Sequence, residues 1–81
     1  MQAKAFTADD IERILHQVML YNSEVGTYVE HRVKDDGYHC SVTLNNGYIV
    51  LYVDEITDSS QLPDGRLRDI AARFRKRQLQ G

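Results

Sequence analysis

The sequence lacks the features that mark most specialised protein classes. It has no tryptophan, one proline, one cysteine and no apolar run approaching the roughly 20 residues of a membrane-spanning helix. Cys40 alone cannot form an internal disulfide, and the N-terminus has neither the charged start nor the apolar stretch of a signal peptide. We therefore expect a cytoplasmic protein with no membrane association.

Common catalytic motifs are missing as well. The chain has no glycine-rich phosphate loop, no serine or cysteine nucleophile beside a base, and no paired carboxylates at catalytic spacing. The three histidines and Cys40 do not all share one predicted face in a way that suggests zinc, so we expect no metal site and no cofactor.

The composition is that of a single globular domain spanning residues 1–81. It is 42% hydrophobic and 27% charged, which argues against disorder. The net charge of −2 is uneven, because residues 1–64 sum to −7 and residues 65–81 sum to +5. The basic end suggests nucleic acid, whereas the acidic remainder argues against a partner that binds by phosphate neutralisation.

The spacing of apolar residues predicts a helix near each end of the chain. Thr7 is a suitable N-cap for the first helix, with Asp10 three residues later as a short-armed capping box. Asp64 is expected to cap the second helix, which continues through the basic segment as far as residue 80. The apolar stripes are Ile11, Ile14, Leu15 and Val18 in the first helix, and Leu67, Ile70, Ala71 and Phe74 in the second.

Between the helices the pattern predicts three strands, over residues 27–35, 38–45 and 48–54. The dipeptides Asp36-Gly37 and Asn46-Gly47 are typical of two-residue hairpin turns. These turns place Val33 opposite Cys40 and Leu44 opposite Ile49. The acidic residues 54–64 are interpreted as a loop. The expected fold is therefore α+β, a three-stranded antiparallel meander with two helices packed on one face.

This register sorts the strand residues onto two faces. The core face is expected to hold Val29, His31, Val33, Cys40, Val42, Leu44, Ile49, Leu51 and Val53. The open face is expected to hold Tyr28, Glu30, Arg32, Lys34, His39, Ser41, Thr43, Asn45, Tyr48, Val50 and Tyr52. The last strand is apolar on both faces and lies at an edge, which indicates a surface that meets another chain. An equally open alternative is that tyrosine and valine simply favour strands.

The candidate protein-binding residues are Tyr28, Tyr48, Val50, Tyr52 and Arg32, with a homodimer as the simplest version. His39 is a candidate general base on a phosphodiester, with Arg32 and Lys34 as phosphate contacts. The alternative interpretation of His39 is a surface histidine beside a turn.

The second helix offers a nucleic-acid surface through Arg66, Arg73 and Arg77. The alternative is that these long side chains cover the flanks of the apolar stripe and keep their charge in water.

Three segments resemble the HicA-type toxins, which are mRNA-cleaving ribonucleases of toxin–antitoxin pairs with a double-stranded-RNA-binding-like fold. They are "GYH" at 37–39, the hairpin glycine Gly47, and "LPDGRLRDI" at 62–70. The resemblance implies a catalytic role for His39 alone and an antitoxin as partner. Tyr38 departs from the family pattern, which usually has a small residue before the histidine, and the acidic charge departs from its basic tendency.

The leading hypothesis is a small non-enzymatic interaction module that binds a protein partner through the tyrosine-bearing face or the strand-three edge. It would be of the inhibitor or adaptor type, like phage or mobile-element proteins that block host nucleases, which is a fold-level analogy. A HicA-like ribonuclease using His39 and an RNA-binding module using the last helix remain as alternatives.

Overall fold

The computed structural model describes residues 6–57 and 62–77. In it the first helix begins directly after Thr7, as predicted. Helix α1 spans Ala8–Val18, and the Thr7 hydroxyl accepts a hydrogen bond from the Asp10 N–H at 3.2 Å. The Asp10 carboxylate binds Arg13 at 3.0 Å. The whole predicted stripe of α1 is buried, so the 3.6-residue period identified its inner face correctly.

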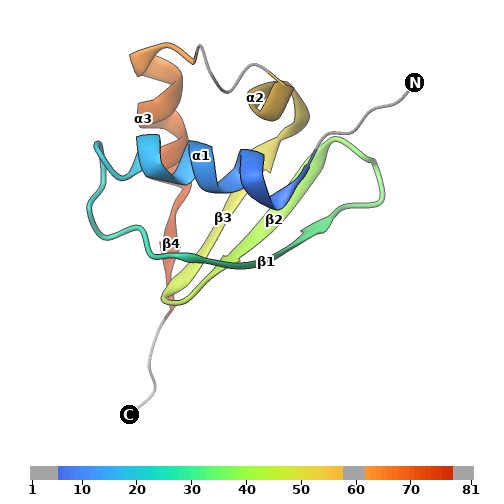
Figure 1. Ribbon diagram of the computed structural model, residues 1–81, viewed down its shortest axis with the longest axis horizontal. Coiled ribbons are helices and arrows are strands. Elements are labelled where there is room, and N and C mark those ends of the chain that lie inside the picture. The colour runs from blue at the N-terminus through green and yellow to red at the C-terminus, as the bar shows by residue number, and fades with distance from the viewer. Residues whose placement is uncertain (1–5, 58–61, 78–81) are drawn as a thin grey trace.

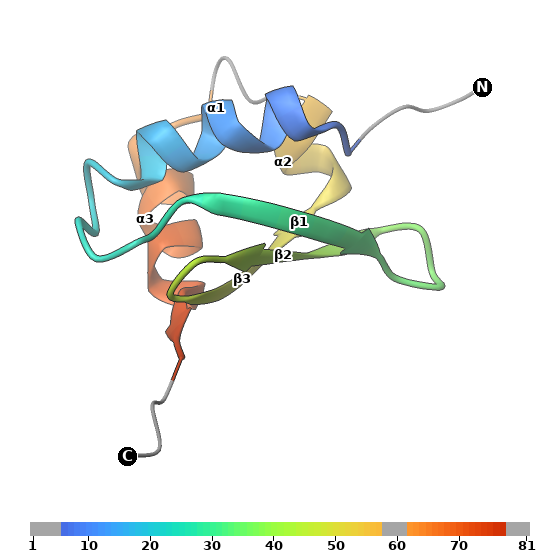
Figure 2. The ribbon, with the colours of Figure 1, turned by 60° about the horizontal axis from the view of Figure 1, so that its bottom comes forward.

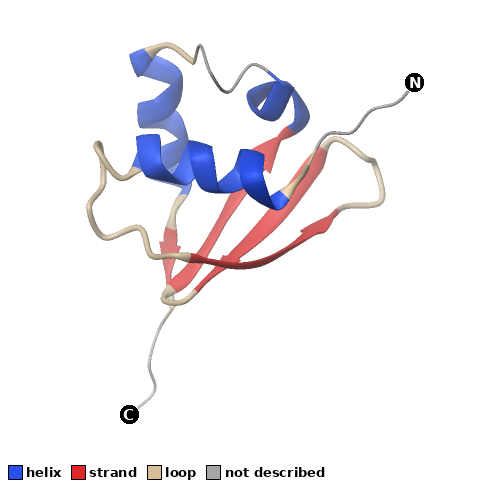
Figure 3. Ribbon diagram, viewed as in Figure 1, coloured by secondary structure: helices blue, strands red, loops and turns tan. Residues whose placement is uncertain are grey.

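The sheet has four antiparallel strands where three were predicted. The strands are β1 (Tyr28–Val33), β2 (His39–Leu44), β3 (Gly47–Tyr52) and β4 (Arg75–Lys76), in the order β1-β2-β3-β4 (Figures 1 and 3). The short β4 pairs with the start of β3, with Gly47 opposite Lys76 and Tyr48 opposite Arg75. The prediction that strand three is an edge strand is therefore wrong.

The first hairpin keeps the predicted register with a longer loop. The Lys34 N–H donates to the His39 carbonyl at 2.9 Å, and the Gly37 N–H donates back to the Lys34 carbonyl. Residues 35–38 form the loop, so the expected two-residue turn has gained one residue on each side. Because the gain is symmetric, Val33 still lies opposite Cys40. Gly37 has φ of 70°, a conformation that glycine adopts without steric cost.

The second hairpin turns one residue earlier than predicted. Asn45 and Asn46 form the bend, Leu44 lies opposite Gly47, and Tyr48 lies opposite Thr43. Pairing has moved by two residues, an even number, so the side chains of the paired residues in β2 and β3 stay on their predicted faces. Position 47 needs glycine because a Cβ there would collide with the carbonyl of Arg75 in β4.

A bulge near the start of β1 overturns two predicted positions. Tyr28, not Val29, lies opposite Leu44, and the register shifts between Tyr28 and Glu30. Tyr28 is thereby turned toward the helices, where it packs against the core and its hydroxyl contacts His31 Nδ1 at 2.7 Å. The extra residue, Val29, was expected in the core and is 53% exposed. Val33 was also expected in the core and is 45% exposed.

Two further helices complete the fold. Helix α2 (Val53–Thr57) replaces the start of the predicted acidic loop, and Val53 begins it instead of pairing with Cys40. Helix α3 (Asp64–Arg73) has Pro63, not Asp64, at its N-cap. It ends at Arg73 because Phe74 is extended, so the predicted helical course through residues 75–77 is wrong. The predicted continuation over 78–80 lies outside the described residues.

The described helices lie on one side of the sheet, and none of them covers the other side (Figures 1 and 2). The buried core contains the α1 stripe and, from the other elements, Val25, Cys40, Val42, Leu44, Ile49, Leu51, Ile56, Leu67, Ile70, Ala71 and Phe74. None of the described helices combines the length and the hydropathy required of a membrane span.

Candidate interaction surface

The bare face of the sheet displays its side chains in rows that cross the strands. Cross-strand partners share a face, so the ladder pairs define each row. The Lys34–His39 backbone bond extends the pattern by one pair beyond β1. The rows are Glu30–Thr43–Tyr48–Arg75, Arg32–Ser41–Val50, and Lys34–His39–Tyr52. We call this surface the open face.

The predicted binding residues fall on the open face with one exception. Tyr48, Val50, Tyr52 and Arg32 are placed there by the register. Tyr28 is not, because the bulge directs it into the core on the helix side. Tyr38 takes its place in the aromatic group, since its ring stacks on Tyr52 with centroids 5.6 Å apart.

Open depressions occur at two corners of the open face. One is lined by Lys34, Asp35, Asp36, His39 and Val50. The other is lined by Thr43, Gly47, Tyr48, Arg75, Lys76 and Arg77, and is therefore bordered by three cations and an exposed aromatic ring. Arg75 and Arg77 thus belong to the surface, although the sequence reasoning placed them on a helix.

His39 is held by a carboxylate and by two aromatic rings. Its Nδ1 lies 2.7 Å from Asp36 Oδ2, and the rings of Tyr38 and Tyr52 meet its ring edge-on at 5.2 and 5.0 Å. Hydrogen bonds from the Tyr38 N–H and then from His39 hold the pKa of Asp36 below its ordinary value. An ionised Asp36 can therefore orient the imidazole.

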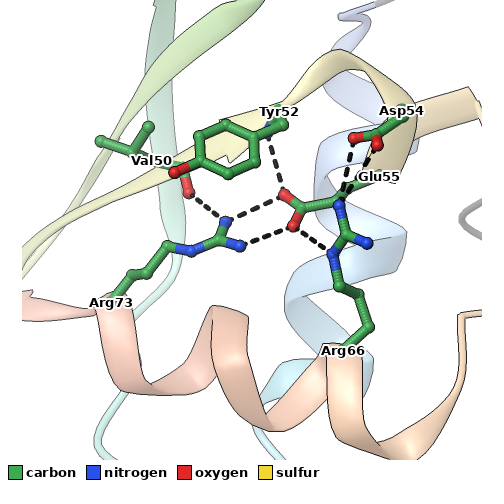
Figure 4. Close-up of polar contacts among 6 residues, drawn as sticks. All are labelled: Val50, Tyr52, Asp54, Glu55, Arg66 and Arg73. Atoms are coloured by element: carbon green, nitrogen blue, oxygen red, sulfur yellow. Dashed lines mark hydrogen bonds and ion pairs between the residues drawn. The ribbon is translucent and has the colours of Figure 1, made fainter.

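The Tyr52 ring packs against the guanidinium of Arg73 (Figure 4). The Arg73 guanidinium lies 4.3 Å from the Tyr52 ring centroid, which is cation–π geometry. The same group donates to the Val50 carbonyl at 3.1 Å. Arg73 thereby binds the backbone of β3 at Val50, past the residues Gly47 and Tyr48 that pair with β4.

Glu55 is a fully buried carboxylate that holds this edge together. Its Oε1 accepts hydrogen bonds from the Tyr52 N–H and Arg73, and its Oε2 accepts from Arg73 at 2.7 Å and Arg66 at 2.8 Å (Figure 4). Burial alone would raise the pKa of Glu55, but the hydrogen bonds from Arg73, Arg66 and the Tyr52 N–H outweigh it and lower that pKa.

This network involves two of the three arginines that were predicted to bind nucleic acid. Arg66 and Arg73 are bound to Glu55, and Arg66 also binds Asp54 at 3.2 Å, so both are committed to internal ion pairs. Arg77 lies beyond the end of α3, where its N–H donates to the Asn46 carbonyl. The three arginines therefore do not all lie on one helix, as the prediction assumed. Sequence reasoning missed Glu55 because it lies in the predicted loop. The seven-residue spacing of Arg66 and Arg73, which puts them on one helix face, was the available signal.

The remaining titratable residues do not form a metal site in the described part of the chain. His31 is engaged by Tyr28, and burial raises the pKa of the Cys40 thiol. Within residues 6–57 and 62–77 no group of three or more His, Cys, Asp or Glu side chains could hold a metal ion.

Comparisons with models of known protein families, with curated proteins and with solved structures gave no match for this chain. The resemblance to HicA-type toxins therefore stays a prediction.

Proposed function

We propose that the protein is a non-enzymatic interaction module, of the inhibitor or adaptor type, that binds a protein partner through the open face. The observation that carries the proposal is the sheet face left bare by all the helices, on which Tyr48 is 49% exposed. Tyrosine, with its rigid ring and polar hydroxyl, is enriched at the centres of protein interfaces.

The charge of the open face indicates what kind of partner it suits. Its cations outnumber its carboxylates, although the whole chain carries a net charge of −2. The cations are Arg32, Lys34, Arg75 and Arg77, and the carboxylates are Glu30, Asp35 and Asp36. Complementary potential steers association, so we propose an acidic protein surface as the partner.

A protein suits this surface better than a nucleic acid does. Glu30 stands in the same row as Tyr48 and would repel a phosphate backbone, whereas a protein can oppose it with a lysine or arginine. Arg66 and Arg73, which a nucleic-acid binder would need free, are paired with Glu55.

The decisive test compares surface variants in capture from a nuclease-treated lysate of the source cell. We expect a protein retained by the native chain to be lost with Tyr48→Ser and with Arg75→Glu. The matched control is Leu20→Ser, which changes an 81% exposed residue outside the open face and should retain the partner. Equal retention by all variants, or loss of the partner on nuclease treatment, would refute the proposal.

A ribonuclease is the second candidate function, favoured by the contact between His39 and Asp36. A carboxylate on Nδ1 fixes the tautomer that leaves Nε2 as the base, and Lys34 borders the same depression. The resemblance to HicA-type toxins points to the same histidine.

The ribonuclease candidate is tested with Asp36→Asn. Asparagine retains an oxygen for the Tyr38 N–H and the His39 N–H while replacing the oxygen that faces the ring. We expect RNA cleavage to fall with this variant and to vanish with His39→Ala, with unchanged circular dichroism. No cleavage by the native chain would eliminate this candidate and leave the interaction module unaffected.

A further inference from the structure

We infer that a second copy of this chain pairs with the free edge of β1, joining two sheets into one. Four strands in the order β1-β2-β3-β4 leave β1 at an edge in the described part of the chain. This inference does not depend on the proposed partner of the open face, because it concerns the edge of the sheet.

Within the described residues, the backbone of β1 presents hydrogen-bonding groups along this edge that no neighbouring strand uses. In an antiparallel ladder only alternate residues exchange backbone bonds with a given neighbour. Lys34 donates to β2, and by alternation so do Arg32 and Glu30. The N–H and C=O groups of His31 and Val33 consequently point away from β2, toward the place that an added strand would occupy.

The side chains along the edge are apolar at its ends and oppositely charged in its middle. Val29 is 53% exposed and Val33 is 45% exposed, and both would lose water contact against another strand. Glu30 and Arg32 lie between them on the open face. Along Val29–Val33 the residues are apolar, acidic, histidine, basic and apolar. When a second copy of the strand runs antiparallel to the first, each acidic residue can therefore lie opposite a basic one.

One register uses this symmetry fully. With the two-fold axis at His31, Glu30 lies opposite the partner's Arg32 and Arg32 lies opposite the partner's Glu30. The bulged Val29 then lies near the partner's Val33. Opposite-charge pairs directly across a ladder are stabilising and like charges are destabilising.

Neighbouring registers place like charges face to face. An axis at Arg32 sets Arg32 against the partner's Arg32. An axis at Val33 sets Arg32 against the partner's Lys34. The charges therefore select the His31-centred register and disfavour indiscriminate pairing, which is how proteins protect an open edge.

The resulting dimer has a two-fold symmetric, isologous interface, the commonest kind in homo-oligomers. Its continuous sheet runs β4-β3-β2-β1 and then β1-β2-β3-β4 of the second copy. The open faces of the two copies become a single surface, and the helices of both copies lie on its other side.

The test is a charge-reversal cycle read out by molar mass in light scattering. The native chain, with a monomer mass of 9.3 kDa, is expected at 18.6 kDa. Glu30→Arg and Arg32→Glu should each raise the dissociation constant roughly tenfold or more by placing like charges in both reciprocal pairs. The double variant with both substitutions should restore the dimer. Neither residue faces a charged partner within its own sheet, since Thr43 and Ser41 lie opposite, so all variants should keep the native circular dichroism.

Val33→Pro provides an independent variant, because it removes an N–H that faces away from β2 and is compatible with an edge strand. It should give a folded monomer. A native chain that is monomeric at every concentration, a dimer that survives the single reversals, or a double variant that stays monomeric would each overturn the inference. Each outcome concerns mass and not partner capture, so it is distinct from failure of the proposed function.

Discussion

The two edges of this sheet differ in whether the outward-facing backbone groups of β3 and of β1 have partners in the described chain. Beyond β3 the backbone is closed by β4 at Tyr48, by the Arg73 guanidinium at Val50 and by the Glu55 carboxylate at Tyr52. Beyond β1 the described chain supplies no strand, and two exposed valines flank the free backbone. A sheet edge can thus be closed by side chains as well as by a strand. The edge left without either is the one available for pairing.

The largest effect on stability is expected for Glu55→Gln, which removes the negative charge that binds Arg66 and Arg73 at the closed edge. We expect unfolding free energy to fall by roughly 3 kcal/mol, the low end for breaking a buried ion pair. The low end applies because the Arg66 and Arg73 side chains, 35% and 22% exposed, can partly regain water. Urea denaturation measures the loss. Glu24→Gln, which breaks an exposed pair with Lys76 at 3.8 Å, is the control and should change stability by under about 0.5 kcal/mol.

Gly47→Ala attacks the same edge through the backbone. A Cβ at this position collides with the Arg75 carbonyl, so β4 must move away and stability should fall by about 2 kcal/mol. Gly65→Ala is the matched control, because no atom other than those of its chain neighbours and its own helix backbone lies within 4 Å of its Cβ position. Alanine in α3 should stabilise the protein by about 0.5–1 kcal/mol. Equal effects at both positions in thermal unfolding would contradict the close approach of β4.

Acid should weaken the closed edge gradually. The pKa of Glu55 is lower in the folded protein than its ordinary value of 4.5, so folding is favoured by the ionised carboxylate. This contribution is complete above the ordinary value and declines as the pH falls through it toward the folded pKa. Because the pKa is lowered, the folded carboxylate stays ionised to a lower pH than an unperturbed glutamate would, so the decline should be gradual. Denaturation series at successive pH values should show a shallower acid slope for the variant than for the native chain.

The smallest expected effect is on the exchange rates of backbone amide hydrogens, with no change in the free energy of unfolding. In the monomeric Arg32→Glu variant, the His31 and Val33 amides should exchange rapidly, because they face away from β2. The Tyr52 amide, bound by buried Glu55 at 2.9 Å, should exchange slowly. In concentrated native protein the His31 and Val33 amides should become protected. Slow exchange at these sites in the monomer would show that β1 is covered from within the chain.

Local sequence patterns predicted the parts of the fold that depend on neighbouring residues. Thr7 and the α1 stripe were correct because a helix cap and a helical period involve residues only a few positions apart. The faces of β2 and β3 were correct although the second turn was misplaced by one residue, because the pairing moved by an even number. Tyr28 was assigned to the wrong face because no local signal marked the bulge after it.

The candidate site was only partly predictable. Tyr48, Val50, Tyr52, Arg32 and His39 lie on the open face as the alternation indicated. Asp36 was recognised only as a turn residue, and its contact with His39 depends on the longer loop that the turn became. Arg66 and Arg73 were read as free cations because their partner, Glu55, comes from a segment without helical or strand periodicity.

Sequence alone determined the first helix, the alternation of the two faces and the charge pattern along β1, because each depends on residues adjacent in the chain. Only the tertiary structure decided which edge of the sheet is open. That outcome required α3 to end at Arg73 and return the chain beside β3, and required a glutamate from α2 to meet two arginines from α3. Contacts between such distant segments are set by packing of the whole core, which no local pattern encodes.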